Sequence, residues 1–571
     1  MHRYAKIPSL LGASLLALAG GTALAETAPA IVAASITTSD LVIAPQSVPA
    51  APAGKLLTLT VDGVEMPLAP GHYTGNVALT VTDDIPVDYH KVMLHHFRAA
   101  AYVENGVLVP AKSVTAALSP QATASDGVLA NAAITSHGER FNGIVVAGTG
   151  AYRIDHPVIE FTGNGGNDFA GYGAGIVATD NADVTIDRPI IRTTGAIRTA
   201  VFVGGNATVH VNDAEIEVRN GTLPPDYKFT VDMGKMMEVP WMLGLSGNVR
   251  ATNLVGNGTV FYNRSHIRAQ GWGGVSTDDS VRVRMYVNDS LIETVDSGYG
   301  CYSIGDSIDT FAHSIVRAAD VGCIMAAQGS VTFTDGTLVE SGRFGVMMHS
   351  GEGGGSLRID KGSHLRARET AIEVKGIGTT VLVDGATVQA GNGVILQSMD
   401  NDDPFMKAIM RGEIPAGMAA PPPGVAEADK KGPAPSPDVV ATFRNTSLAG
   451  NFFNARSRNS AMILHFENAR LAGQIATSTT APALGKEPTA VTYREIGRVT
   501  NTAGFVAGSA GVEVFLDATS RWTVTGPSYL RALTLAPGAR LESTRGKAVM
   551  QIDGKTVPIR PGTYRGAIIV N

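Results

Sequence analysis

The fold class is decided by two stretches that repeat one pattern, Gly298-Tyr-Gly-Cys-Tyr-Ser-Ile-Gly-Asp-Ser307 and Asp320-Val-Gly-Cys-Ile-Met-Ala-Ala-Gln-Gly329. In each, a small residue leads into a short apolar run. Similar segments recur at spacings of roughly 22 to 27 residues, at 173–178, 198–203, 271–280, 343–349, 369–375 and 392–397. Three short strands and three turns fill such a repeat. The sequence therefore predicts an all-β right-handed parallel β-helix, whose stacked coils bury a continuous apolar core.

The composition agrees with many short strands joined by tight turns. The 571 residues include 66 glycines, only 6% are aromatic, and valine, isoleucine and threonine recur in short runs. A short piece near Met93 to Tyr102 is the exception, because it has a helical period. A leucine-rich repeat has a similar period, but its leucine–asparagine signature is missing. A β-sandwich would show alternation without a fixed register. The chain has 45 basic and 51 acidic residues, and this acidic excess argues against nucleic acid as a partner.

The first 25 residues have the features of a secretory signal peptide. Arg3 and Lys6 precede an apolar stretch, and Ala23-Leu24-Ala25 is a small-x-small cleavage site. We therefore expect an exported protein, periplasmic or extracellular, without a transmembrane segment. The other expected divisions are an N-terminal region (26–135), the β-helix (136–545, with inserted loops at 221–240 and 399–438) and a C-terminal segment (546–571).

A second repeat links the two ends of the chain. Val61-Asp-Gly-Val-Glu-Met-Pro-Leu-Ala-Pro-Gly-His-Tyr-Thr-Gly75 matches Ile552-Asp-Gly-Lys-Thr-Val-Pro-Ile-Arg-Pro-Gly-Thr-Tyr-Arg-Gly566 at seven of 15 positions. Two copies at opposite ends suit a capping role, because the terminal coils would otherwise expose unpaired sheet edges. The alternative is pairing between the copies, within one chain or between chains in an oligomer.

Cys301 and Cys323 occupy equivalent positions in consecutive repeats. Strand spacing would bring their Cα atoms near the lower end of the disulfide range, and an oxidising compartment would permit the bond. The alternative is a pair of stacked, buried thiols. Neither cysteine has a histidine in its motif, so neither has the features of a catalytic nucleophile.

The same alignment predicts a ladder of functional side chains along one edge of the coils. Its polar members are Asp278, Asp279, Asp306, Gln328, His349, Lys375 and Asn248. A parallel row would hold the aromatic residues Trp272, Tyr299 and Phe344. Neighbouring carboxylates raise each other's pKa, which suits an acid and a base, and aromatic faces can stack on sugars. The alternative is that these Asp, Asn and Gly residues only form turns.

The repeats resemble the pectate-lyase and polygalacturonase superfamily of single-stranded right-handed β-helices. Ser276-Thr-Asp-Asp279, followed by Ser297-Gly-Tyr-Gly-Cys-Tyr-Ser-Ile-Gly305, is similar to the polygalacturonase order of paired aspartates and a Gly-His-Gly segment. The resemblance implies acid and water-activating roles for Asp278 and Asp279. Tyr299 stands where that family has histidine, the upstream Asn-Thr-Asp motif is missing, and the only Arg-x-Lys lies far downstream, at 545–547.

The stretch from Ser520 to Leu535 resembles the final coils of adhesin and autotransporter passenger repeats. Two functions follow from these observations, and we lean slightly to the first. One is an enzyme that acts on a polysaccharide, either as a hydrolase using Asp279 and Asp306 or as a lyase using Tyr299, His349 or Lys375. A lyase would need a cation such as calcium, although no calcium-loop motif is present. The other is a non-catalytic adhesin, matrix component or glycan-binding scaffold.

Overall fold

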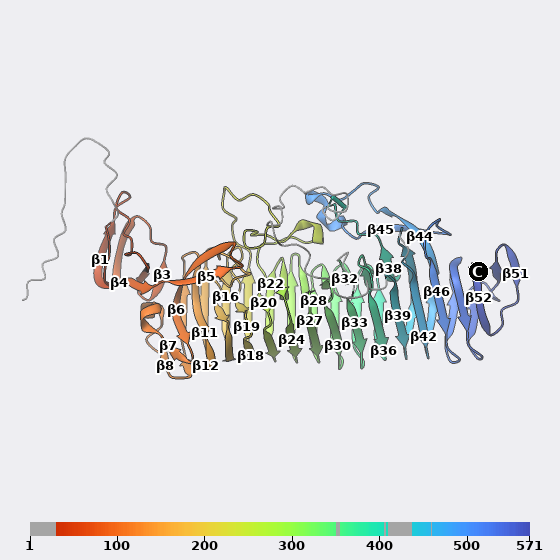
Figure 1. The fold of residues 1–571 in the computed structure, drawn as a ribbon, viewed down its shortest axis with the longest axis horizontal. Coiled ribbons are helices and arrows are strands. Elements are labelled where there is room, and N and C mark those ends of the chain that lie inside the picture. The colour runs from red at the N-terminus through yellow and green to blue at the C-terminus, as the bar shows by residue number, and fades with distance from the viewer. Residues whose placement is uncertain (1–29, 350–353, 405–406, 409–436, 458–459) are drawn as a thin grey trace, which may run out of the picture.

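The computed structural model describes residues 30–571, except 350–353, 405–406, 409–436 and 458–459. The signal peptide expected at residues 1–25 and most of the insert expected at 399–438 lie outside the described residues. The chain is almost entirely β-structure, and its strands stack into long parallel ladders (Figure 1). Each turn of the chain adds one strand to each of three ladders, an arrangement that fits a β-helix.

The first ladder carries the segments that define the repeat. Its strands are β11 (Phe141–Ala147), β14 (Ile176–Ala178), β17 (Val201–Val203), β20 (Thr252–Gly256), β23 (Gly273–Ser280), β26 (Tyr299–Ile304), β29 (Val321–Ala326), β32 (Phe344–Met348), β35 (Ile372–Val374), β38 (Val394–Met399), β41 (Asn451–Ala455) and β44 (Ile475–Pro482). Residues at the same position of successive strands form a column of side chains that point into the core. In one such column Cys301 pairs with Cys323, and Cys323 pairs with Val346. These side chains are fully buried in the central core.

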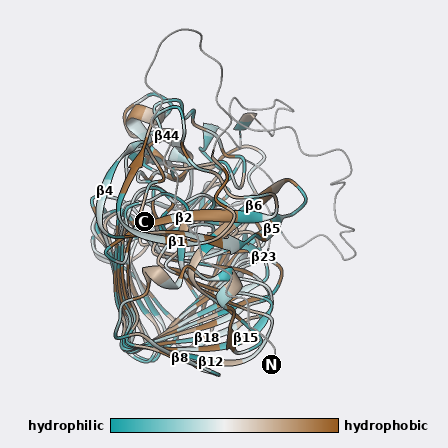
Figure 2. Ribbon diagram, turned by 90° about the vertical axis from the view of Figure 1, so that its left-hand side faces the viewer, coloured by the Kyte–Doolittle hydropathy of each residue, from teal (hydrophilic) through white to brown (hydrophobic). Residues whose placement is uncertain are grey.

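The second ladder lies on the side away from the large inserts, as the view along the molecule's long axis shows (Figure 2). Its strands are β12 (Thr149–Asp155), β15 (Asn181–Asp187), β18 (Thr208–Asn212), β21 (Thr259–Asn263), β24 (Val283–Asn288), β27 (Ser307–Ala312), β30 (Ser330–Thr334), β33 (Ser356–Asp360), β36 (Thr380–Asp384), β39 (Val439–Arg444), β42 (Met462–Glu467) and β46 (Val512–Leu516). Buried and half-buried residues alternate along most of these strands, because successive side chains of a strand point to opposite faces.

The third ladder completes each coil. Its strands are β10 (Ala133–Ser136), β13 (Val158–Thr162), β16 (Ile190–Thr194), β19 (Glu215–Arg219), β22 (His266–Gln270), β25 (Leu291–Val295), β28 (Ile315–Ala318), β31 (Leu338–Ser341), β34 (His364–Ala367) and β37 (Thr387–Ala390). A four-stranded sheet supplies the equivalent strands near the C-terminus: β40 (Ser447–Ala449), β43 (Arg470–Gly473), β47 (Arg521–Val524) and β49 (Arg540–Ser543).

The two matched end segments fold into similar antiparallel hairpins at opposite ends of the molecule (Figure 1). The first comprises β2 (Lys55–Val61), β3 (Val64–Met66) and β4 (Gly71–Asp83), beside β1 (Ile36–Ile43). The second comprises β50 (Met550–Ile552), β51 (Lys555–Val557) and β52 (Gly562–Val570), beside β48 (Ser528–Leu535). Asp62 and Asp553 both have positive φ and both accept a hydrogen bond across the hairpin, from the backbone N–H of Asn76 and Ala567 at 2.8 and 3.0 Å.

One local expectation was wrong. The sequence around 93–102 suggested a short helix, but it forms the strand β6 (Met93–Glu104). Its first half, 93–97, pairs antiparallel with β5 (Ile85–Tyr89), and its second half, 98–104, pairs parallel with β11, so partner strands follow it along its length. Pairing with neighbouring strands overrides a weak local helical pattern. The short strands β7 (Val107–Leu108), β8 (Thr123–Ser125) and β9 (Val128–Ala130), with the 3-10 turns η1 (Pro110–Lys112) and η2 (Thr115–Ala117), complete this end.

Inserts cover one long side of the molecule (Figure 1). The segment between β19 and β20 includes η3 (Trp241–Leu243), and it packs over the first ladder. A second insert, which the sequence did not suggest, runs between β44 and β46 and contains η4 (Ala490–Glu495) and β45 (Val499–Ala503). The two inserts meet where the Tyr493 hydroxyl donates to the Ser246 hydroxyl over 2.9 Å. No helix among the described residues is long and apolar enough to cross a membrane.

Candidate functional site

The expected aromatic row exists in part, but it is covered. Tyr299, Val321 and Phe344 follow one another in register, while Trp272 lies one residue before the partner of Tyr299. The three aromatic side chains are at most 3% exposed. They pack with Met236 and other apolar residues of the insert between β19 and β20. Their faces are therefore not open to a sugar in this structure.

The register and the ion pairs of the predicted acids differ from the alignment expected from sequence. Val275 pairs with Cys301, so the first segment is shifted by one residue from the alignment expected from sequence. Asp279 contacts His90, whereas Asp306 lies 3.6 Å from Arg284. The two carboxylates proposed as an acid and base pair therefore have separate partners.

Asp278 belongs to a buried ion cluster. Arg250 donates to Asp278 over 2.8 Å and to Asp168 over 2.6 Å, and its guanidinium lies against the rings of Trp272 and Phe169. Burial raises the pKa of Asp278, and Arg250 offsets part of that effect. The single guanidinium bridges the two carboxylates and joins the segment at 163–175 to the first ladder. It does not present a free acid.

The polar positions Asn248 and Gln328 lie apart from this cluster. The side chain of Asn248 donates to the carbonyl of Gly221 over 2.8 Å, which closes the base of the insert. Gln328 is exposed just beyond β29. Asn248 therefore closes a turn, and Gln328 lies at the surface.

His349 and Lys375 do lie together, in a second buried cluster. The Nζ of Lys375 lies 2.6 Å from Oδ1 of Asp402 and 3.3 Å from Oε1 of Glu373. Burial raises the pKa of Glu373 to about 7. Burial and the charge of Lys375 lower the pKa of His349 to about 4. Sequence reasoning missed Glu373, although residues two apart in a strand share a face, and it had no signal for Asp402, which lies in an insert.

Cys301 and Cys323 are adjacent in register, fully buried and present as free thiols. Burial raises the pKa of the Cys301 thiol, which keeps it protonated and unreactive.

The third ladder carries an outward column in which acid and base alternate from coil to coil. The register places the following residues side by side: Glu160, Arg192, Glu217, Arg268, Glu293, Arg317, Glu340 and Arg366. The closest ion pair joins Arg317 to Glu293 at 2.7 Å. Most of these groups are substantially exposed, so they form a charged surface with both signs interleaved.

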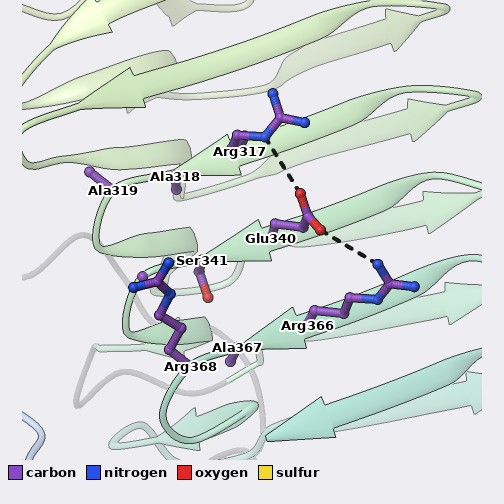
Figure 3. Close-up of a pocket in the computed structure, with 9 residues that line it drawn as sticks. Arg317, Ala318, Ala319, Glu340, Ser341, Arg366, Ala367 and Arg368 are labelled. Carbon is purple, nitrogen blue, oxygen red and sulfur yellow. Dashed lines mark hydrogen bonds and ion pairs between the residues drawn. The ribbon is translucent and has the colours of Figure 1, made fainter. Parts of the chain in front are cut away.

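A hollow of about 540 Å³ lies beside this column (Figure 3). Ala319 and Gly342 form part of its lining, because the coils carry small residues there. Charged side chains surround them: Arg317, Glu340, Arg366 and Arg368. Glu340 lies 3.5 Å from both Arg317 and Arg366, as the dashed lines in Figure 3 mark.

Two further hollows extend this one into a groove along the coils. The first, of about 410 Å³, shares Ala319 and Gly342 and adds Arg343, Arg494 and Arg498. The second, of about 260 Å³, shares Asp296 with it and adds Arg219 and Arg268. In all, eight arginines and five carboxylates line the groove: Arg219, Arg268, Arg317, Arg343, Arg366, Arg368, Arg494 and Arg498, with Glu217, Asp296, Asp320, Glu340 and Glu369. Sequence analysis missed it, because its wall at 490–498 is far away in the chain.

Within the described parts of the chain, no group of three or more His, Cys, Asp or Glu side chains is placed to hold a metal ion. No protein-family model matches the chain, and no curated protein matches it significantly in sequence.

Proposed function

We propose that this chain is an exported right-handed parallel β-helix that holds an acidic polysaccharide in the arginine-lined groove. The observation that carries the proposal is the hollow beside β28, β31 and β34, where Arg317, Arg366 and Arg368 surround a lining that includes Ala319 and Gly342. Such a hollow leaves room for a sugar ring and supplies cations for its acidic group.

The chemistry of the lining supports an anionic ligand. The planar guanidinium of arginine matches a carboxylate or sulfate with two parallel hydrogen bonds. Arginines exceed carboxylates eight to five along the groove, so its net charge is positive although the whole chain is acidic. The main hollow, of about 540 Å³, lies within the usual size range of ligand pockets. Coils repeat every ~4.8 Å, which suits a polymer better than a single small molecule.

Binding fits this geometry better than cleavage. Asp278 is paired with Arg250, Asp279 with His90, and Lys375 with Asp402. Hydrolysis through Asp279 and Asp306, and β-elimination through Tyr299, His349 or Lys375, remain predictions from sequence, as does a need for calcium. We propose that these groups hold the inserts in place instead.

The two matched hairpins support the capping hypothesis. Each adds antiparallel strands where the parallel ladders end, and antiparallel hairpins cover the hydrogen-bonding edges that a terminal coil would expose. We propose that they act as caps; end-to-end pairing of chains is the alternative.

Binding measurements with the mature protein test the proposal. Calorimetry would compare polygalacturonate and a sulfated dextran with unmodified dextran, at low and high salt. We expect the two acidic polymers to bind, with an affinity that falls as salt increases, and the neutral polymer not to bind. Reducing ends and unsaturated uronates would be followed in the same samples. Equal binding of neutral and acidic polymers would contradict the proposal, and release of reducing ends would restore the enzyme hypothesis.

A further inference from the structure

The buried cluster around Lys375 contains a nucleophile, an electrophile and a proton carrier in contact. Lys375 Nζ lies 2.6 Å from Oδ1 of Asp402 and 3.3 Å from Oε1 of Glu373. The side chains of Lys375 and Glu373 are fully buried, and that of Asp402 is 13% exposed. Neither carboxyl oxygen of Glu373 has a hydrogen-bond partner within normal geometry.

Three separate segments build this arrangement. Glu373 lies in β35 and Lys375 directly follows it, so both side chains leave the same face of the strand. Asp402 follows β38 on the next coil. Its second oxygen, Oδ2, accepts the backbone N–H of Gly497 over 2.7 Å. That hydrogen bond orients the carboxyl group, so that its other oxygen faces Lys375.

We infer that Lys375 and Asp402 condense into an isopeptide bond, with Glu373 as the catalytic proton carrier. A proton passes from the Lys375 ammonium to Asp402, and the free amine then attacks Cγ of Asp402. Glu373 donates its proton to the departing hydroxyl and takes one from the nitrogen. The new bond is Nζ–Cγ, the broken bond is Cγ–Oδ, one water leaves, and no oxidant or reductant is required.

The reaction starts from an ion pair: despite desolvation by burial, Asp402 and Glu373 raise the pKa of Lys375, and Lys375 lowers the pKa of Asp402. The burial that raises the pKa of Glu373 to about 7 keeps much of it protonated near neutral pH, as a proton donor must be. The contact also holds the reacting atoms together, which removes the entropic barrier of bringing them into place.

The chain supplies its own negative control. Lys235 Nζ lies 2.6 Å from Oδ2 of Asp232, the same separation as in the buried pair. Lys235 is 53% exposed, so water stabilises its charged form. We therefore expect Lys235 to keep its free amine.

The bond would close a covalent ring between two residues that are 27 positions apart in the sequence, which is about one coil of the ladder. It would fix the start of the insert after β38 to the neighbouring coil, and with it the 490–498 segment that contacts Asp402 through Gly497. This consequence does not depend on whether the groove binds a glycan.

Mass spectrometry of the denatured mature protein tests the inference. We expect the intact mass to lie one water below the sequence mass, and a protease digest to yield a branched peptide joining Lys375 to Asp402. Lys235 should appear in ordinary linear peptides. A wild-type protein with its full mass would overturn the inference.

Three variants test the roles of the residues, each read by intact mass. Lys375→Arg should have its full sequence mass. Asp402→Asn should still form the bond but release ammonia, so its product should have the same mass as the cross-linked wild type. Glu373→Gln should leave the bond largely unformed. Complete bond formation in Glu373→Gln would overturn the catalytic role of Glu373.

Discussion

Replacement of Arg250 by methionine tests the interpretation that the predicted acids hold the fold together. Arg250 is 1% exposed and contacts two carboxylates, that of Asp168 at 2.6 Å and that of Asp278 at 2.8 Å. Methionine keeps much of the side-chain length but removes the charge. Both carboxylates would then remain buried without their cation.

The expected loss is large. Removing one partner of a buried ion pair destabilises proteins by about 3–5 kcal/mol, because the remaining charge is left uncompensated. Here Asp168 is as buried as Arg250, whereas Asp278 is 14% exposed and so less strongly penalised. We therefore expect a loss of about 3–5 kcal/mol at neutral pH, dominated by Asp168.

The loss should depend on pH. Burial already raises the pKa of Asp278 above the unfolded value of about 4, and without Arg250, which lowers it, this pKa should rise further. A raised carboxyl pKa destabilises the folded state at high pH, and the penalty disappears as the pH falls and the groups take up protons. The difference in unfolding free energy between wild type and variant should therefore shrink from neutral pH towards about pH 4.

Urea unfolding followed by circular dichroism measures this difference, and hydrogen exchange of peptides from β20 and β23 localises it. Arg264→Met is the matched control, because Arg264 makes a similar pair with Asp213 at 2.8 Å but is 57% exposed. The control should lose at most about 1 kcal/mol. Adding Asp168→Asn and Asp278→Asn to the Arg250 variant should recover part of the loss. Equal losses in both arginine variants, or a loss independent of pH, would refute the reasoning.

Three further outcomes are expected. Arg366→Gln combined with Arg368→Gln should weaken binding of an acidic polysaccharide by about tenfold in calorimetry. Arg153→Gln on the second ladder should not weaken it. Equal effects would show that the groove is not the binding site. Burial raises the pKa of Asp309 in β27 to about 7, so ionisation destabilises the folded state as the pH rises between about 4 and 7. The stability advantage of Asp309→Asn over wild type should grow across that window in urea titrations and stay constant above it; a constant difference would contradict the assignment. Cys301 and Cys323 should resist a thiol reagent in the native protein and react fully in urea, and fast native labelling would contradict their burial.

Repetition made the ladders predictable from sequence. A glycine before an apolar run, repeated at the length of one coil, placed Cys301 beside Cys323, and the structure pairs them in register. The match between the two end segments likewise predicted similar structures, and Asp62 and Asp553 form equivalent turns. Local patterns of this kind predict the structure correctly, because the strand periodicity and turn chemistry that produce them act over a few residues.

The candidate site was only partly predictable. The alignment of Gly271 to Ser280 was one residue off, and a shift of that size moves side chains between faces. In the structure Asp278 pairs with Arg250, and Asp306 lies beside Arg284. From the sequence, 221–240 was expected only as an inserted loop, whereas the insert between β19 and β20 covers Trp272, Tyr299 and Phe344.

The sequence by itself determined the all-β class, parallel strands that repeat at about 22 residues or slightly more, and the likeness of the two end segments. Only the tertiary structure decided which side chains are open to solvent and which ions meet. The arginine-lined groove and the contact of Lys375 with Asp402 both depend on inserts that fold back onto the ladders. The physical reason is that coil stacking follows from short-range periodicity, whereas the packing of an irregular insert depends on contacts with residues far away in the chain, which no local pattern encodes.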